Sequence, residues 1–448
     1  MAWSYLPHTD EDRRTMLAAI GVEKVEEIFC DIPDKLLFKR PLDLPPAMSE
    51  PEIVNAMQKL AGKNANLQEY TCFLGAGAYD HYIPSVVDHV IGRSEFYTAY
   101  TQYQPEISQG YLQALWEYQS MICQLTGMEV SNASMYDGGT ALAEAAMMAC
   151  SVTRRSEVLV ASTVHPNYRE VLHTYGRDRE YKITELGYAD GTVNLAEATQ
   201  LMSKNVAAII LQSPNFFGCI EDVKKIVELA HAQGALLIVA VDPISLGLLE
   251  APGVLGADIV VGEGQPMGLA PAFGGPYLGF FAVNEKLMRK MPGRIVGQTV
   301  DHEGNRGFVL TLQAREQHIR REKATSNICS NEALCALTAA VYLSAVGKVG
   351  LQKVAGLSLQ KAHYACRELT KLSGFSSAFG ASYFKEFVIR CPKPVAKINA
   401  ELLQEKIIGG LDLECYYPEL KNCMLLCVTE NRTQGDIDKL VEKLGAMV

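Results

Sequence analysis

Apolar strand-like segments alternate with helix-like segments between about residues 70 and 320, and this alternation constrains the fold more than any other feature. The apolar segments have the length of buried strands, and the stretches between them have helical spacing. Such alternation predicts an α/β domain with a mainly parallel sheet. The predicted strands are Val158–Ser162, Ala207–Gln212, Leu236–Asp242, Asp258–Gly262 and Gly279–Val283, and the predicted helices include Leu112–Thr126, Ala141–Ser151 and Glu221–Gln233.

The flanking regions differ from this core and predict three parts. Residues 1–70 are polar with helical spacing, a cap at Thr9-x-x-Asp12 and several prolines, and we predict a helical arm. Residues 71–330 form the large α/β domain. Residues 331–448 are predicted to hold a connector helix and a small α+β domain. Its elements are helices over 331–350 and 351–373, strands Glu386–Arg390 and Asn422–Thr429, and helices Val395–Lys406 and Gly435–Leu444.

Composition excludes several classes of function. The 448 residues carry 41 Lys and Arg against 51 Asp and Glu, a net charge of −10, which argues against binding to nucleic acid or to an anionic membrane. No apolar run is seen to approach the ~20 residues that cross a bilayer. The amino terminus carries acids and arginines where a secretory signal needs an apolar core, so we expect a cytoplasmic protein. Twelve dispersed cysteines without metal-ligand spacing predict neither a disulfide framework nor a metal site.

An acidic residue ends one of the predicted strands. Asp242 precedes Pro243, and the glycine-rich turn 273–276 follows further along the chain. An acid at the carboxyl end of a buried strand can pair with the pyridinium nitrogen of pyridoxal phosphate. A strand-end acid with a purely structural role is the alternative, and this motif alone leaves both interpretations open. The nearby glycine pairs do not complete a dinucleotide-binding motif.

Two long strings carry a family resemblance. Residues 97–110 and 316–329, together with the shorter Ser131–Ser134 and Gly256-Ala-Asp-Ile, resemble the P-protein of the glycine cleavage system, a pyridoxal-phosphate-dependent glycine decarboxylase. The resemblance extends from Pro7 to the carboxyl end. A chain of this length looks like the amino-terminal half of that enzyme, which is a separate α subunit in many bacteria. The resemblance implies the type I pyridoxal-phosphate fold, with a seven-stranded, mainly parallel sheet and a small α+β carboxyl-terminal domain.

The lysine that this chemistry requires is missing. Such enzymes hold pyridoxal phosphate as an aldimine on a lysine, because only a primary amine condenses with its aldehyde. No lysine occurs from Ile226 to Glu285, and Gln265 stands at the lysine position of the similar catalytic subunit. The resemblance therefore implies that this chain forms no internal aldimine and that a β subunit holds the cofactor covalently. A structural role for Asp242 then gains weight, and whether it retains another role stays open.

The resemblance also implies a reaction. The chain and its β partner, expected as α2β2, would decarboxylate glycine and transfer the aminomethyl group to the lipoyl arm of the H-protein, an oxidoreductase activity. Two alternatives stay open. One is an autonomous pyridoxal-phosphate lyase or aminotransferase that uses another lysine, such as Lys286. The other is a scaffolding subunit that touches no ligand.

Candidate site residues fall into three groups. Thr325, Ser326 and Asn327 are expected to reach the partner's cofactor phosphate, or else to cap the 331–350 helix. Residues Tyr97, Tyr100 and Tyr103, spaced by three, and His81 are candidates for a substrate pocket, with core packing as the alternative. Arg315, Arg320, Arg321 and Lys323 form a basic cluster that would dock the acidic H-protein, with a solvated helix face as the alternative.

Overall fold

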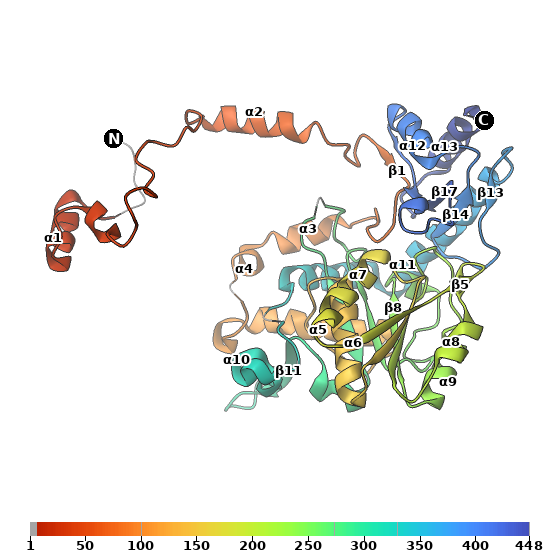
Figure 1. Cartoon of the computed structure of the whole chain (residues 1–448), viewed down its shortest axis with the longest axis horizontal. Helices are drawn as coiled ribbons and strands as arrows, with labels where there is room; N and C mark the ends of the chain where they lie inside the picture. Colours follow the sequence, from red (N-terminus) through yellow and green to blue (C-terminus); the bar gives the residue numbers. More distant parts are fainter. Residues whose placement is uncertain (1–6, 100, 273, 329, 448) are drawn as a thin grey trace. The chain divides into compact units, whose positions relative to one another are not determined.

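The chain divides into two compact units, residues 1–65 and residues 66–448. The structure, a computed structural model, describes residues 7–99, 101–272, 274–328 and 330–447. Figure 1 labels the elements. The predicted boundaries after residues 70 and 330 stay predictions. The first unit ends at residue 65, close to the end that we predicted for the arm.

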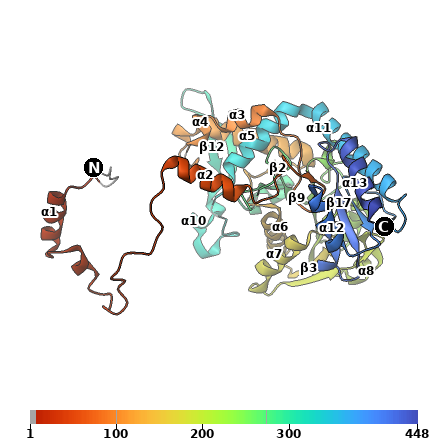
Figure 2. The ribbon, with the colours of Figure 1, turned by 90° about the horizontal axis from the view of Figure 1, so that it is seen from above.

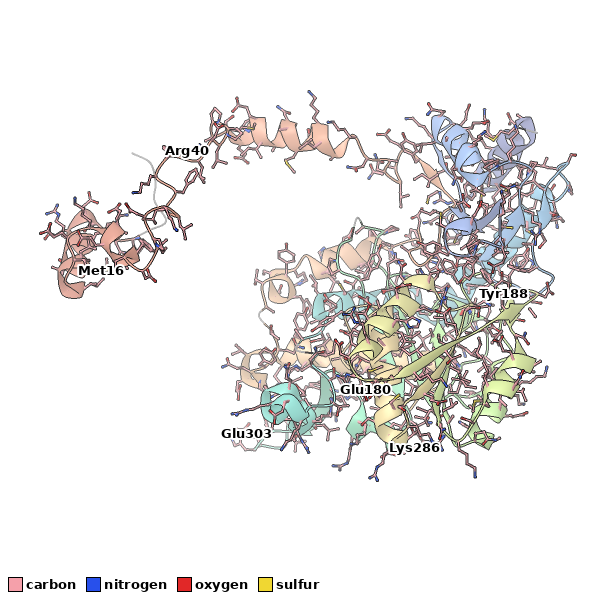
Figure 3. The ribbon with its side chains drawn as sticks, in the orientation of Figure 1. Met16, Arg40, Glu180, Tyr188, Lys286 and Glu303 are labelled. Carbon is pink, nitrogen blue, oxygen red and sulfur yellow. The ribbon has the colours of Figure 1, made fainter. Side chains whose placement is uncertain are left out.

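Within residues 7–65, the described part of the first unit, the helices are short and no side chain is buried. This unit contains α1 (Asp10–Ile20), the 3₁₀ helix η1 (Val25–Phe29) and α2 (Glu50–Ala61), none of which holds a buried residue. Thr9 and Asp12 form the capping box at the start of α1, which confirms the predicted cap. Figure 3 shows Met16 and Arg40 of this unit, and Met16 is exposed.

The second unit is built on a seven-stranded sheet with the order β2-β10-β9-β8-β7-β3-β4. The strands from β9 through β8, β7 and β3 to β4 are parallel, and β10 runs antiparallel to β9 and β2. This sheet confirms the predicted fold class. Its strands are β2 (Val130–Ser131), β3 (Glu157–Ala161), β4 (Lys182–Leu186), β7 (Val206–Gln212), β8 (Leu236–Val241), β9 (Ile259–Glu263) and β10 (Gly279–Val283).

The central strands are apolar along nearly their whole length, as expected for a sheet covered on both faces. Helix α6 packs across β7 to β10, and α9 packs on β7 and β8. Figure 2 shows α5 beside α11, in agreement with their contacts. The helices are α3 (Ser85–Ile91), α4 (Ser94–Tyr97), α5 (Gln109–Thr126), α6 (Gly138–Thr153), α7 (Pro166–Arg177), α8 (Leu195–Leu201), α9 (Val223–Ala232) and α10 (Gln317–Arg320).

Helix α11 (Ala333–Leu369) leads into the carboxyl-terminal region and is kinked at Gly347, so it joins the two helices predicted over 331–373. By length and composition it could cross a membrane, and 44% of its most apolar window is buried inside the protein. The expectation that no stretch reaches that length is therefore wrong for α11. Its buried residues Ala336, Ala339 and Tyr342 pack in the main core.

The carboxyl-terminal region forms a second, four-stranded sheet with the order β13-β14-β17-β16, drawn in blue in Figure 1. Strand β14 pairs with β17 in an antiparallel register that places Glu386 opposite Cys427. The elements are β13 (Ser376–Ser377), β14 (Glu386–Arg390), α12 (Val395–Gln404), β15 (Ile407–Ile408), β16 (Leu411–Asp412), β17 (Cys423–Cys427) and α13 (Gln434–Ala446). The smaller strands elsewhere are β1 (Thr71–Cys72), β5 (Tyr188–Ala189), β6 (Thr192–Val193), β11 (Ile295–Val300) and β12 (Arg306–Thr311).

A loop after β7 fastens this second sheet to the large sheet. Phe384 donates its backbone N–H to the carbonyl of Gly218 over 3.0 Å, and Ile220 donates to Ser382 over 2.8 Å. Gly218 has φ +82°, and a Cβ there would lie 1.9 Å from the carbonyl oxygen of Glu386. Only glycine allows this close approach, which sets the position of the chain just before β14.

Replacing Gly218 by alanine tests this junction. We expect Gly218→Ala to lower the free energy of unfolding by about 1–3 kcal/mol, because the methyl group forces two backbones apart. Gly356→Ala is the control: it lies in α11 with no atom within 4 Å of the added Cβ. Urea unfolding should show little change or a gain for the control. Equal effects of the two substitutions would contradict this account of the junction.

Candidate functional site

A small cavity lies at the carboxyl edge of the parallel sheet. It has a volume of about 30 Å³. Asp242, the residue after β8, lies on it, as the sequence predicted for the strand-end acid. The cavity is lined by Gly77, Tyr79, His165, Tyr168, Gln212, Pro214, Gly218, Ala240, Val241, Asp242, Pro243, Gly262, Glu263, Phe384, Lys385 and Glu386.

Asp242 is already paired within the chain. Its Oδ2 lies 2.6 Å from Nζ of Lys385, the residue before β14, and its Oδ1 accepts the backbone N–H of Ile244 over 3.0 Å. The side chain of Lys385 is 1% exposed. The strand-end acid therefore meets a cation from the second sheet and not an open crevice.

The Lys385 ammonium has a partner for each of its three N–H groups. Besides Asp242, it lies 2.9 Å from Nε2 of His81 and 3.5 Å from the centroid of the Tyr79 ring. A buried ammonium is tolerated only when its donors are satisfied, and a cation over an aromatic face adds attraction. Sequence reasoning missed Lys385, although the charged pair Lys385-Glu386 among aromatic residues, just before an apolar strand, was the available signal.

His81 belongs to this buried cluster. It is 4% exposed, and its Nδ1 lies 2.7 Å from Oε2 of Glu430 while Nε2 faces Lys385. Burial, and then the Lys385 ammonium, lower the pKa of His81. A neutral imidazole that donates through Nδ1 and accepts at Nε2 fits both neighbours. Both ring nitrogens of His81 are used within the chain, and its substrate role stays a prediction.

Gln265 is buried and fully hydrogen bonded. Its Nε2 donates to the carbonyls of Tyr79 over 3.0 Å and of Leu269 over 2.6 Å, and its Oε1 accepts the N–H of Tyr79 over 2.9 Å. The amide thus ties the segment around Tyr79 to the turn after β9. Because an amide nitrogen is not a nucleophile, no aldimine can form at this position.

Two carboxylates occupy the start of α6, where a helix would otherwise bind an anion. Asp137 Oδ1 accepts the N–H of Thr140 over 2.7 Å, and Glu263 Oε2 accepts the N–H of Gly138 over 3.0 Å. Glu263 also accepts the N–H groups of Gln265 and Leu278. Burial raises the pKa of Glu263 to about 7.

The residues in and next to this cavity do not fit pyridoxal phosphate. Asp242 on its lining is held by Lys385, and Gln265 nearby supplies no amine. Asp137 and Glu263 already accept the N–H groups at the start of α6 that a phosphate would need as donors. The volume of about 30 Å³ is also far below the roughly 300 Å³ at which ligand pockets begin. No chemical step of this chain is therefore assigned through that cofactor.

Lys286 is not an alternative anchor for the cofactor. Its Nζ lies 3.2 Å from Asp258, which directly precedes β9 and therefore lies at the amino edge of the parallel sheet. The Lys286 side chain is 66% exposed, and Figure 3 shows it at the end of this unit away from the carboxyl-terminal elements. The alternative of an autonomous enzyme that uses Lys286 is wrong for this geometry.

The segment expected to reach a partner's phosphate lies on a separate small cavity. Thr325 and Ser326 line it, and Ser326 Oγ donates to Oε1 of Glu144 on α6 over 2.9 Å. Asn327 is exposed. The alternative reading of these residues as the cap of the following helix is wrong, because α11 begins after Glu332 and has no side-chain cap.

The tyrosines do not share a pocket with His81. Tyr97 ends α4 and is 69% exposed. Tyr103 accepts a hydrogen bond from Arg294 Nη2 over 3.2 Å, and its ring lies under that guanidinium. Tyr100 lies outside the described residues. Neither of the cavities described above is lined by Tyr97 or Tyr103, and the substrate role of these tyrosines stays a prediction.

The basic cluster splits into a structural arginine and exposed residues. Arg315 is half-buried and donates to the carbonyls of Met291 and Gly293, and burial lowers its pKa. These contacts tie Arg315 to its own chain, and its part in docking a partner stays a prediction. Arg320, Arg321 and Lys323 are exposed, so their docking role stays a prediction.

Ionisation of the buried Glu386 gives a prediction. It accepts the N–H of Ala76 over 2.7 Å and the hydroxyl of Tyr79 over 2.8 Å, and burial raises its pKa to about 7. A carboxyl whose pKa is raised by folding stabilises the folded state fully below its ordinary pKa of 4.5, and this contribution is lost as the pH rises through about 7.

Replacing Glu386 by glutamine should remove this ionisation. Relative to the wild type, the Glu386→Gln variant should gain on the order of 2–3 kcal/mol in free energy of unfolding between pH 5 and pH 8. Urea unfolding at both pH values measures the difference, and the exposed Glu250→Gln provides the control. A difference independent of pH would show that Glu386 does not titrate in this range.

Known proteins are similar to this chain over nearly its whole length. The family "Glycine cleavage system P-protein" matches residues 3–444. The chain is 59% identical over 443 residues, 99% of each chain, to the probable glycine dehydrogenase (decarboxylating) subunit 1 of Desulforamulus reducens. It is 55% identical over 445 residues, again 99% of each, to the probable subunit 1 of Anoxybacillus flavithermus.

Solved structures support the same relationship. The crystal structure of glycine decarboxylase (P-protein) of the glycine cleavage system, in inhibitor-bound form, matches with a TM-score of 0.91 and 42% identity over 100% of both chains. A sphingosine-1-phosphate lyase of Burkholderia pseudomallei matches with a TM-score of 0.66 and 14% identity over 91% of this chain and 92% of that one, which shows the shared type I fold alone. This chain belongs to the glycine cleavage system P-protein family.

Proposed function

We propose that this chain is the α subunit of a two-component glycine decarboxylase whose homologous β subunit holds pyridoxal phosphate covalently. Relatives named subunit 1 of glycine dehydrogenase (decarboxylating), similar over their full length, support both the reaction and a second subunit. The observation that carries the assignment of the cofactor to the partner is Gln265, a buried amide at the position where an amine is required.

The overall reaction balances with a lipoyl disulfide as electron acceptor. The bond between the carboxylate and the α carbon of glycine breaks, and carbon dioxide leaves. The electron pair left on carbon forms a bond to one sulfur of the lipoyl arm of the H-protein, while the disulfide opens and its other sulfur takes a proton. Pyridoxal phosphate on the β subunit supplies the electron sink for this decarboxylation.

The first unit of the chain supports an assembly of several subunits. Its helices bury no side chain within the unit, and it exposes Ile20, Phe29, Leu36, Phe38 and Leu44. Large exposed apolar surfaces mark protein interfaces, and these residues are the ones we expect to meet a neighbouring subunit. The expected stoichiometry is α2β2, with this arm covering a neighbouring subunit. A cytoplasmic location is proposed as well, supported by the free state of the eleven cysteines in the described residues.

The loop from Thr325 to Asn327 is the proposed contribution of this chain to the β subunit's site. Its hydroxyl and amide groups suit the oxygens of a phosphate. Arg320, Arg321 and Lys323 are exposed close to this loop in sequence and would attract an acidic lipoyl carrier. H-protein binding should then weaken as salt increases.

Borohydride trapping tests where the cofactor is held. Reduction of the assembled, pyridoxal-phosphate-loaded complex should fix the cofactor to a lysine of the β subunit and leave residue 265 of this chain unmodified, because Gln265 has no amine to react. Mass spectrometry of peptides from both chains is the measurement. A stable adduct on this chain, or glycine decarboxylation by this chain alone, would overturn the proposal.

Substituting Thr325 separates a contributing subunit from a scaffold. In the complex, Thr325→Val should weaken the binding of pyridoxal phosphate about tenfold or more, since a hydrogen bond to a charged group contributes about 1.5–3 kcal/mol. Absorbance titration measures the affinity. Thr199→Val on α8 is the matched control, because Thr199 is exposed and its hydroxyl donates only to the carbonyl of Leu195 in its own helix. Unchanged affinity in Thr325→Val would favour the scaffold alternative.

A further inference from the structure

Four side chains form a continuous buried chain of contacts between the two sheets of the second unit. We refer to Asp242, Lys385, His81 and Glu430 as the Lys385 network. Lys385 lies 2.6 Å from Asp242 and 2.9 Å from His81, and His81 lies 2.7 Å from Glu430. Asp242 follows β8 of the large sheet, whereas Lys385 precedes β14 and Glu430 follows β17. The network therefore joins both sheets through ionic hydrogen bonds.

The ends of the network are also satisfied. Oε1 of Glu430 accepts the N–H of Tyr82 over 2.7 Å, and its Oε2 accepts the hydroxyl of Ser358 over 3.2 Å. Asp242 accepts the N–H of Ile244. Burying charges is costly unless such partners are in place. Every charged group of the network therefore has a hydrogen-bond or ion-pair partner, as a stable buried ionic network requires.

The backbone holds Lys385 in this position. Its carbonyl accepts the N–H of Val428 over 2.9 Å, and the N–H of the preceding Phe384 donates to Gly218. On the other side, Glu386 pairs with Cys427 across the second sheet. The side chain can leave Asp242 only by giving up three buried contacts, since the backbone before β14 cannot move away alone.

We propose that Lys385 is a built-in cation that takes the place facing Asp242 and closes this pocket to a pyridine cofactor, whatever residue stands at position 265. The network then keeps the second sheet fixed on the large sheet without a bound ligand. This inference concerns the chain's own pocket, so it holds whether or not the β subunit carries the cofactor.

A double-mutant cycle on Asp242 and Lys385 tests the coupling in the full chain. Asp242→Asn and Lys385→Met should each lower the thermal midpoint, because each leaves one buried charge unpaired. The double variant should lose less than the sum of the two losses. Lys348→Met, at an exposed lysine on α11, should leave the midpoint unchanged. Additive losses, or an unchanged midpoint in Lys385→Met, would overturn the proposal.

Introducing an amine tests the closure of the pocket. Pyridoxal is the probe, because it lacks the phosphate that Asp137 and Glu263 would repel. After borohydride reduction of the complex, peptide mass spectrometry compares labelling at residue 265 with labelling at the exposed Lys353 of the same chain. Circular dichroism establishes that each variant is folded.

In the Gln265→Lys variant alone, residue 265 should be labelled no more than the exposed Lys353. Gln265→Lys combined with Lys385→Ala should label at least tenfold more, whereas Gln265→Lys combined with Lys348→Ala should match the single variant. Strong labelling in the single variant would show that Lys385 does not close the pocket. Absence of any increase in a folded Lys385→Ala combination would overturn the proposal equally. Labelling of the β subunit reports separately on the function proposed above.

Discussion

The ion pair between Asp242 and Lys385 is the interaction on which this structure depends. It lies at the carboxyl edge of the parallel sheet, where α/β proteins place their ligands, and it connects that edge to the second sheet. The cavity that remains has a volume of only about 30 Å³. The space next to Asp242 is therefore filled by the chain's own side chains, of which Lys385 makes the direct contact.

Local sequence patterns predicted the architecture because they follow from short-range physics. Apolar runs such as Leu236–Asp242 read directly as buried strands, and the cap at Thr9 depends on residues three apart. The absence of a lysine at Gln265 was equally visible. Lys385 could not be found in this way, because its contact with Asp242 joins residues 143 positions apart and exists only once both sheets have formed.

The same limit explains why the sequence did not show the surroundings of several candidate residues. Charge spacing grouped Arg315 with Arg320, but only the fold places the carbonyls of Met291 and Gly293 around Arg315. Polar spacing near Thr325 resembles a cap, yet α11 begins later, after Glu332. His81 carries no sequence signal that distinguishes a substrate ligand from a partner of a buried lysine.

The most direct measurement is an experimental structure of the assembled complex loaded with pyridoxal phosphate, at a resolution that shows side chains. The account predicts that Nζ of Lys385 remains within hydrogen-bond distance of Asp242 in this chain, with the cofactor ring seen only on the β subunit. A cofactor ring facing Asp242, with Lys385 turned away from it, would contradict the account.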